Sequence, residues 1–169
     1  GKSEEEFPFD DHVVFGSVGD DSVQSVSDDV APYYNMVNLQ KFFKSIGMPY
    51  TDANKSAVVS PTLDLLEVDF CKRSFSLEFD ERVYSAPLAL DSIYKSLHNQ
   101  MESATDSIEV QCQTVDGALR ELVLHGEAIF NEEAVIIRQA CEDFQISHLI
   151  KNLYRPWHSW KAEFMQKRH

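Results

Sequence analysis

The stretch that decides the fold is His12-Val13-Val14-Phe15-Gly16-Ser17-Val18-Gly19-Asp20-Asp21-Ser22-Val23-Gln24-Ser25-Val26. Two short valine-rich runs flank a Gly-Asp-Asp tripeptide, which is typical of the strands and loop of a β-hairpin. The stretch therefore predicts a hairpin with two adjacent carboxylates, Asp20 and Asp21, at its tip. Gly19, the turn glycine before them, allows backbone or ligand to approach closely.

The two carboxylates suggest the chemistry of this tip. At a tight turn both can reach one cation, and a hard ion such as Mg²⁺ takes one or two carboxylates and keeps its other positions for water and phosphate oxygens. This interpretation indicates metal-assisted phosphoryl or nucleotidyl transfer. Aspartate and glycine are also ordinary turn residues, so the tripeptide alone favours a solvated loop.

The segments that follow the turn decide between these two interpretations. Val14 to Ser56 runs from the Gly-Asp-Asp turn through a Tyr-Asn pair, an amphipathic segment and a glycine to Tyr50-Thr51-Asp52-Ala53-Asn54-Lys55. Phe70-Cys71-Lys72-Arg73-Ser74-Phe75 and Tyr84-Ser85-Ala86-Pro87-Leu88 come next. In this order they resemble motifs C, D and E and the start of the thumb in viral RNA-dependent RNA polymerases, especially picorna-like ones. The resemblance covers residues 12–130.

The resemblance implies roles for individual residues. Asp20 would coordinate a catalytic Mg²⁺ or Mn²⁺, and Asp21 would support that site or bind the second ion of a two-metal mechanism. Lys55 matches the motif D lysine, which is proposed in the family as the general acid that protonates the leaving pyrophosphate. Lys72 and Arg73 match the motif E pair that contacts the primer or product strand of RNA.

Several of these positions also allow a purely structural interpretation. Without the resemblance, Lys55 would be read as a solvated surface lysine, and Lys72 with Arg73 as a charged turn that keeps an edge strand from aggregating. Val18 and Ser22 differ from the aromatic residue and the asparagine that are common at these positions in the family. Both residues are compatible with a β-strand. The differences therefore affect the expected contacts with sugar or metal and not the assignment of the motif.

The resemblance also implies polymerase parts beyond this chain. In the family, the motif A aspartate, motif B and the basic motif F all precede the Gly-Asp-Asp hairpin, and only eleven residues precede His12 here. We therefore expect the missing upstream fingers and palm segment as a partner, together with RNA template, primer and nucleoside triphosphates. We expect this fragment alone to be inactive.

Composition limits the classes of protein to which this chain can belong. The chain has 169 residues, of which 43% are hydrophobic and 25% charged, as in ordinary globular domains. No apolar run approaches the ~20 residues of a transmembrane segment, and the first residues lack a signal-peptide pattern. A soluble intracellular protein is therefore expected, and the resemblance places it in the host-cell cytoplasm within viral replication complexes. Three widely spaced cysteines favour reduced thiols.

The net charge of −13 disfavours an RNA grip by this chain alone, because proteins that hold a phosphate backbone usually present a basic stripe. Either the basic channel lies upstream or the fragment does not bind RNA. Lysine and arginine are concentrated at Lys72-Arg73 and between Lys151 and Arg168, which favours the first explanation.

Two alternatives belong to other classes of protein. The chain could be a non-catalytic acidic interaction domain that uses its hairpin only as a scaffold. It could also bind Ca²⁺ through Asp20, Asp21, Asp28 and Asp29, but these residues lack the twelve-residue loop with a terminal glutamate.

The period of the apolar residues predicts the remaining elements. Apolar residues over 39–46 recur at helical spacing, and we expect this helix to pack beneath the sheet, to begin near Ser27-Asp28-Asp29 with Pro32 in its first turn, and to end at Gly47. Residues 68–79 alternate as in two strands.

Helical spacing returns from Asp91 onward. A long apolar stripe runs from Val115 to Phe130, and Asn131 is a candidate cap for a further helix. The predicted fold is α+β, and three ranges describe it. They are an acidic N-terminal segment at 1–11, a partial polymerase palm of antiparallel hairpins with a packed helix at 12–86, and an α-helical thumb at 87–169.

Overall fold

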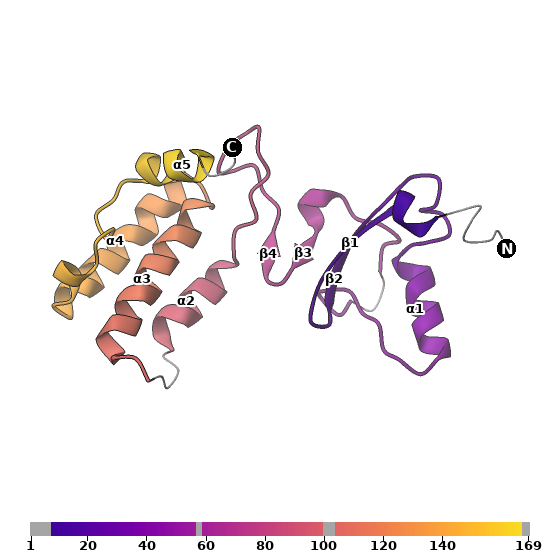
Figure 1. Cartoon of the computed structure of the whole chain (residues 1–169), viewed down its shortest axis with the longest axis horizontal. Helices are drawn as coiled ribbons and strands as arrows, with labels where there is room; N and C mark the ends of the chain where they lie inside the picture. The colour runs from indigo at the N-terminus through magenta and orange to yellow at the C-terminus, as the bar shows by residue number, and fades with distance from the viewer. Residues whose placement is uncertain (1–7, 57–58, 100–103, 167–169) are drawn as a thin grey trace. The chain divides into compact units, whose positions relative to one another are not determined.

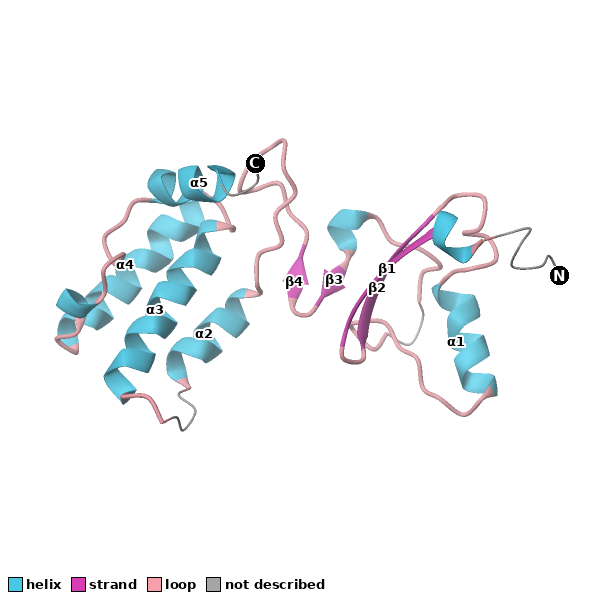
Figure 2. Cartoon of the chain, viewed as in Figure 1, coloured by secondary structure: helices cyan, strands magenta, loops and turns pink. Residues whose placement is uncertain are grey.

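The computed structural model describes residues 8–56, 59–99 and 104–166. The chain divides into two compact units, one up to Cys71 and the other from Lys72 onward (Figure 1). The described residues combine four short strands with five α-helices, which confirms a mixed α and β fold (Figure 2). Residues 1–7 of the expected acidic segment and residues 167–169 of the expected thumb lie outside the described part. The palm and thumb ranges remain predictions.

The predicted hairpin is confirmed and organises the first unit. Strands β1 (Val13–Val18) and β2 (Asp21–Val26) are antiparallel, with Val18 paired to Asp21, so Gly19 and Asp20 alone form the loop. Gly19 has a φ of +62°, and a two-residue hairpin loop with a left-handed first residue favours glycine there. Asp20 therefore lies at the turn, whereas Asp21 is already the first residue of a strand.

Helix α1 (Met36–Ser45) begins later than the sequence predicts. Its N-cap is Asn35, whose side-chain oxygen accepts a hydrogen bond from the backbone N–H of Asn38 at 3.1 Å. The Ser27 hydroxyl is used elsewhere: it donates to the carboxylate of Asp29 at 2.5 Å and lies 3.0 Å from Nδ1 of His12. The prediction of a helix start at residues 27–32 was wrong because that segment forms turns.

The C-terminal end of α1 is as predicted. Gly47 has a φ of +78°, and its N–H donates to the carbonyl of Lys44 at 3.1 Å. The next N–H, that of Met48, donates to the carbonyl of Phe43 at 2.9 Å. This pair of bonds is the Schellman arrangement, which satisfies the last carbonyls of a helix and favours glycine at the left-handed position.

The first unit has a small core. Among its described residues, Val13 and Val30 are the buried apolar side chains, while Val14, Phe15 and Phe42 are more than half exposed. The apolar face of α1 is therefore not closely packed against the sheet. The predicted packing of α1 beneath the sheet is therefore incomplete, because a hollow lies between the helix and the hairpin.

The second unit is a helical bundle with a well-packed core. Its helices are α2 (Leu90–His98), α3 (Ser107–Val123), α4 (Glu127–Asp143) and α5 (Trp157–Gln166). Helix α3 packs against α2 and α4, and α5 lies across α3 and α4 (Figure 1). The side chains with no exposed surface are Leu119, Leu122, Val123, Phe130, Ala134, Leu153 and Trp160. Among the described residues, no helix is both long and apolar enough to cross a membrane.

The predicted apolar stripe from Val115 to Phe130 is divided between two helices. Helix α3 ends at Val123 and α4 begins at Glu127, with Gly126 between them at a φ of +91°. A Cβ on Gly126 would lie 3.0 Å from the carbonyl oxygen of Glu78. Asn131 lies inside α4, so the predicted cap at Asn131 was wrong.

The segment between the two units is less regular than the alternating pattern predicts. Strands β3 (Asp69–Phe70) and β4 (Arg73–Ser74) have two residues each and flank a turn at Cys71 and Lys72. Both turn residues have positive φ, at +54° and +61°. Beyond β4 the pairing continues only as isolated bridges, such as the one between Ser76 and Ser85.

Candidate functional site

The Gly-Asp-Asp turn is part of the wall of a hollow of about 360 Å³ in the first unit. Hairpin residues form one side, and α1 with Tyr34 before it and Tyr50 after it forms the other. The lining residues are Phe15, Ser17, Gly19, Asp20, Asp21, Ser22, Gln24, Tyr34, Leu39, Phe42, Phe43 and Tyr50. The structure therefore places both predicted metal ligands at one hollow.

The two carboxylates have different surroundings. Asp20 is exposed in the loop, next to the left-handed Gly19. Asp21 is held in the strand, and the thiol of Cys71 donates a weak hydrogen bond to its Oδ2 with a sulfur–oxygen distance of 3.8 Å. Both carboxylates are thus exposed, one in the loop and one at the start of β2, where it accepts the bond from Cys71.

The donor set of the turn fits a hard divalent cation. Two carboxylates are the ligands that Mg²⁺ and Mn²⁺ accept from proteins when phosphate and water complete the coordination shell. Across residues 8–56, 59–99 and 104–166, no three His, Cys, Asp or Glu side chains gather so that they could hold a metal. Asp20 and Asp21 can therefore supply only part of a metal shell.

The four-aspartate Ca²⁺ site also has no support in the described residues, since no such group gathers there. Asp29 instead bonds Ser27 and lies 3.3 Å from His12. The hydrogen bond from Ser27 is the main reason that the pKa of Asp29 is lowered.

Lys55 lies in a turn built by Asp52. The backbone N–H of Lys55 donates to the carbonyl of Asp52 at 3.0 Å, and the N–H of Ser56 donates to the Asp52 carboxylate at 2.6 Å. Hydrogen bonds from Ser56 lower the pKa of Asp52. Lys55 itself is exposed, has a φ of +53° and does not line the hollow.

The sequence analysis missed the contact made by Tyr50, which precedes this turn. The Tyr50 ring stacks on Phe43 of α1, with centroids 4.8 Å apart and planes 17° apart. Its hydroxyl oxygen lies 3.4 Å from that of Ser22 in β2. Burial, followed by the proximity of Tyr50, raises the pKa of Tyr34. No local pattern in the sequence indicates this contact, because Ser22 and Tyr50 are 28 positions apart.

The two predicted primer-binding residues also differ from one another. Lys72 is exposed on the turn. The guanidinium of Arg73 donates to both carboxylate oxygens of Glu121 at 2.8 and 2.7 Å, and to the carbonyl of Ala86 at 2.8 Å. Arg73 therefore fastens β4 to helix α3 within the second unit, and Glu121 is a partner that the sequence analysis did not identify.

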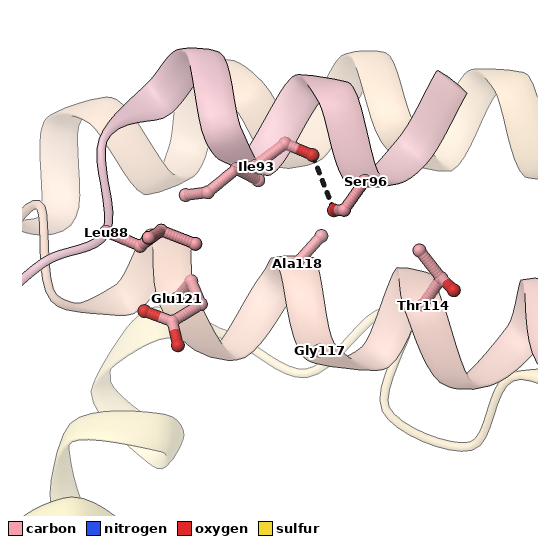
Figure 3. A pocket seen from close by; sticks show the side chains of 7 residues that line it. All are labelled: Leu88, Ile93, Ser96, Thr114, Gly117, Ala118 and Glu121. Carbon is pink, nitrogen blue, oxygen red and sulfur yellow. Dashed lines mark hydrogen bonds between the residues drawn. The ribbon is translucent and has the colours of Figure 1, made fainter. Parts of the chain in front are cut away.

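Glu121 also borders a hollow of about 290 Å³ between α2 and α3 (Figure 3). Ala118 points toward α2 there, and the small residues of α3 create the space. The hydroxyl of Ser96 already donates to the carbonyl of Ile93 at 2.7 Å, and that of Thr114 donates to Val110 at 2.9 Å. The hollow is thus a packing gap whose hydroxyl groups are satisfied.

Two cations of the C-terminal basic stretch are used inside the second unit. Arg155 pairs with Glu163 at 2.5 Å and lies over the Trp160 ring, 4.3 Å from its centroid. Lys161 pairs with Asp80 at 3.0 Å. A backbone hydrogen bond from Arg82, followed by the bond from Lys161, lowers the pKa of Asp80. Arg155 and Lys161 therefore contribute to the packing of the second unit.

The comparisons with known proteins agree with one another on the family. A family model described as viral RNA-dependent RNA polymerase matches residues 2–145. The replicase polyprotein of acute bee paralysis virus (strain Rothamsted) is 31% identical over 134 residues, which are 78% of this chain and 7% of that protein. The replicase polyprotein of cricket paralysis virus is 28% identical over 142 residues, 84% of this chain and 8% of that protein.

A plant virus protein is similar as well. The RNA1 polyprotein of tomato ringspot virus is 36% identical over 112 residues, which are 64% of this chain and 5% of that protein. The chain thus spans less than a tenth of the length of these relatives.

Proposed function

The chain belongs to the viral RNA-dependent RNA polymerase family, and from this premise we propose that it is a palm and thumb part of an enzyme that copies viral RNA. The reaction is template-directed nucleotidyl transfer: the 3′ oxygen of the growing RNA bonds to the α-phosphorus of a nucleoside triphosphate, and pyrophosphate leaves. The observation that carries this proposal is the pair of adjacent carboxylates, Asp20 in the two-residue loop and Asp21 at the start of β2, which both line the hollow.

Asp20 and Asp21 are the residues that would hold the catalytic cations, Mg²⁺ or Mn²⁺. When bound, such ions activate the attacking hydroxyl and neutralise charge on the phosphates. Asp20 is exposed in the loop and would bind an ion directly, whereas Asp21, which accepts the bond from Cys71, would support that site or bind the second ion. Because two carboxylates are an incomplete shell, we propose that the rest of the palm, with its motif A aspartate, supplies the remainder.

Lys55 is the proposed general acid. Its ammonium group can neutralise charge on the leaving pyrophosphate and donate a proton to it. The Asp52 turn supports this role because Asp52 accepts hydrogen bonds from the backbone N–H groups of Lys55 and Ser56 while the Lys55 side chain stays exposed.

We assign the direct contact with primer phosphates to Lys72. Its exposed position on a turn leaves the ammonium group accessible. Arg73 adds positive charge to the same segment, but its guanidinium is already bonded to Glu121 and Ala86. In this proposal Arg73 holds the primer-contacting turn to the second unit.

The partners follow from the proposed reaction. They are RNA template and primer, nucleoside triphosphates, and the fingers and remaining palm of a longer polymerase, within replication complexes in the host-cell cytoplasm. The acidic net charge of −13 is compatible with this only if the basic RNA channel lies in those other parts. The chain alone is then inactive.

The proposal is tested in the longer polymerase that carries these residues. Replacing Asp20→Asn removes a metal ligand and should lower RNA synthesis by roughly 10²–10³-fold, since metal stabilisation of the transition state is worth several kcal/mol. The matched control is Asp28→Asn, an exposed carboxylate away from the turn. Equal activity of the two variants would refute the metal assignment and favour the non-catalytic interaction domain.

A further inference from the structure

Tyr50 connects three segments of the first unit. Its ring stacks on Phe43 of α1, and its hydroxyl reaches Ser22 of β2, immediately after the two carboxylates. Along the chain, Tyr50 precedes by two residues the Asp52 that builds the Lys55 turn. Tyr50 also lines the same hollow as Asp20 and Asp21.

The turn after Tyr50 is held locally. Both hydrogen bonds that shape it are made to Asp52, one to its carbonyl and one to its carboxylate. These bonds fix the shape of residues 52–56 but not their position relative to the hairpin. The position of this turn must be fixed by contacts with other parts of the unit. The side chain of Tyr50 makes such contacts, with Phe43 and with Ser22.

We propose that Tyr50 is a positioning residue that places the Lys55 turn relative to the Gly-Asp-Asp hairpin through its hydroxyl contact with Ser22 and its stack on Phe43. This inference rests on the proposed function, because it assigns Lys55 and the metal-binding turn to one reaction. Lys55 is five residues beyond Tyr50, so its amide lies within about 17 Å of the anchor even if the chain were extended.

The small core of this unit makes a single anchor important. Val13 and Val30 are its buried apolar side chains among the described residues, so there is little other packing to fix the segment after α1. Ser22 matters because its side chain lies on the face opposite Asp21. A contact there can hold the hairpin without occupying the carboxylates.

The test uses the ¹⁵N-labelled chain with Mn²⁺ as a paramagnetic probe. Tyr50→Phe removes the hydroxyl but keeps the ring that stacks on Phe43, and Ser22→Ala removes the other partner. Tyr33→Phe is the matched control, because Tyr33 is 79% exposed. Two quantities are measured for the amides of residues 51–56: the broadening caused by Mn²⁺ and the NMR order parameter.

The proposal predicts that wild type and Tyr33→Phe show Mn²⁺ broadening at residues 51–56 and rigid order parameters near ~0.85. Tyr50→Phe and Ser22→Ala should both lose much of the broadening, and their order parameters at these residues should fall toward ~0.6 or below. Unchanged values in both variants would overturn the positioning role.

The two proposals fail in different ways. If Mn²⁺ leaves residues 19–22 of the wild type unaffected, the metal assignment fails, and the order parameters of the same samples then decide the role of Tyr50. If Mn²⁺ broadens residues 19–22 but both hydroxyl deletions leave residues 51–56 unchanged, the metal assignment stands and the inference about Tyr50 is wrong.

Discussion

The guanidinium of Arg73 makes a two-point hydrogen bond to the carboxylate of Glu121, at 2.8 and 2.7 Å, across 48 positions of sequence. This pair joins the start of the second unit to the middle of its bundle. Arg73, to which the resemblance assigns a contact with RNA, is thus bonded to protein, whereas Lys72 beside it is exposed.

Glu121→Ala should destabilise the second unit. The substitution removes the carboxylate that accepts two hydrogen bonds from a half-buried guanidinium. Loss of such a charged hydrogen-bond partner costs about 1–3 kcal/mol, here at the lower end because both side chains are about a third exposed. Urea denaturation measures the loss. The control is Glu81→Ala, an exposed carboxylate. Equal stability of the two variants would contradict the structural role of the pair.

Lys72→Ala should act on RNA binding and not on folding. In the longer polymerase, loss of one phosphate contact should weaken primer binding for every sequence and reduce the slope of log affinity against log salt by about 1. The free energy of unfolding should stay within about 0.5 kcal/mol of wild type, as for other surface changes. An unchanged salt dependence would show that Lys72 does not contact phosphate.

Gly126 and Gly117 provide a matched pair of substitutions. Gly126→Ala should destabilise the second unit by about 1–2 kcal/mol, because Gly126 has a φ of +91° and a Cβ would meet the carbonyl oxygen of Glu78 at 3.0 Å. Gly117 lies inside α3 with open space at its Cβ position, so Gly117→Ala should stabilise by about 0.5–1 kcal/mol. Thermal unfolding of both variants distinguishes the signs, and a stabilising Gly126→Ala would contradict the described loop.

Tyr94 should titrate late in alkali. A hydrogen bond to Glu133, with some burial, raises the pKa of Tyr94 to about 12. Because the folded pKa exceeds the ordinary value of 10, this group stabilises the fold fully below pH 10 and loses its contribution as the pH rises toward 12. An NMR titration followed at the Tyr94 ring should show this late pKa in wild type, and Glu133→Gln should move it back toward 10. Glu132→Gln, which removes only a weaker charge effect, should move it less.

Local chemistry explains which elements could be predicted from sequence. The hairpin depends on Gly19 in its two-residue loop and on β-branched neighbours, all within one short stretch. The end of α1 depends on Gly47 and the two backbone bonds next to it. In both cases the residues that decide the structure adjoin each other in the chain.

The errors arose where more distant residues decide. Ser27 has good capping chemistry, but its hydroxyl bonds Asp29 and neighbours His12, so Asn35 caps α1 instead. Asn131 was a reasonable cap by type, yet the break falls at Gly126, where the chain closely approaches Glu78.

In the candidate site, too, adjacent residues could be predicted from the sequence and distant contacts could not. The adjacent carboxylates Asp20 and Asp21 are visible in the sequence as a pair, and the structure places them at one hollow. The contacts of Tyr50 with Ser22 and of Cys71 with Asp21 span 28 and 50 positions. No local pattern encodes contacts at such separations, so only the structure reveals them.

The central claim is that the Gly-Asp-Asp turn binds a divalent cation, and the most direct test is Mn²⁺ broadening of the NMR spectrum of this chain. The account predicts selective broadening at residues 19–22 that is lost in the Asp20→Ala, Asp21→Ala double variant and kept in Asp28→Ala. Broadening spread over the acidic surface and unchanged in the double variant would contradict a metal site at this turn.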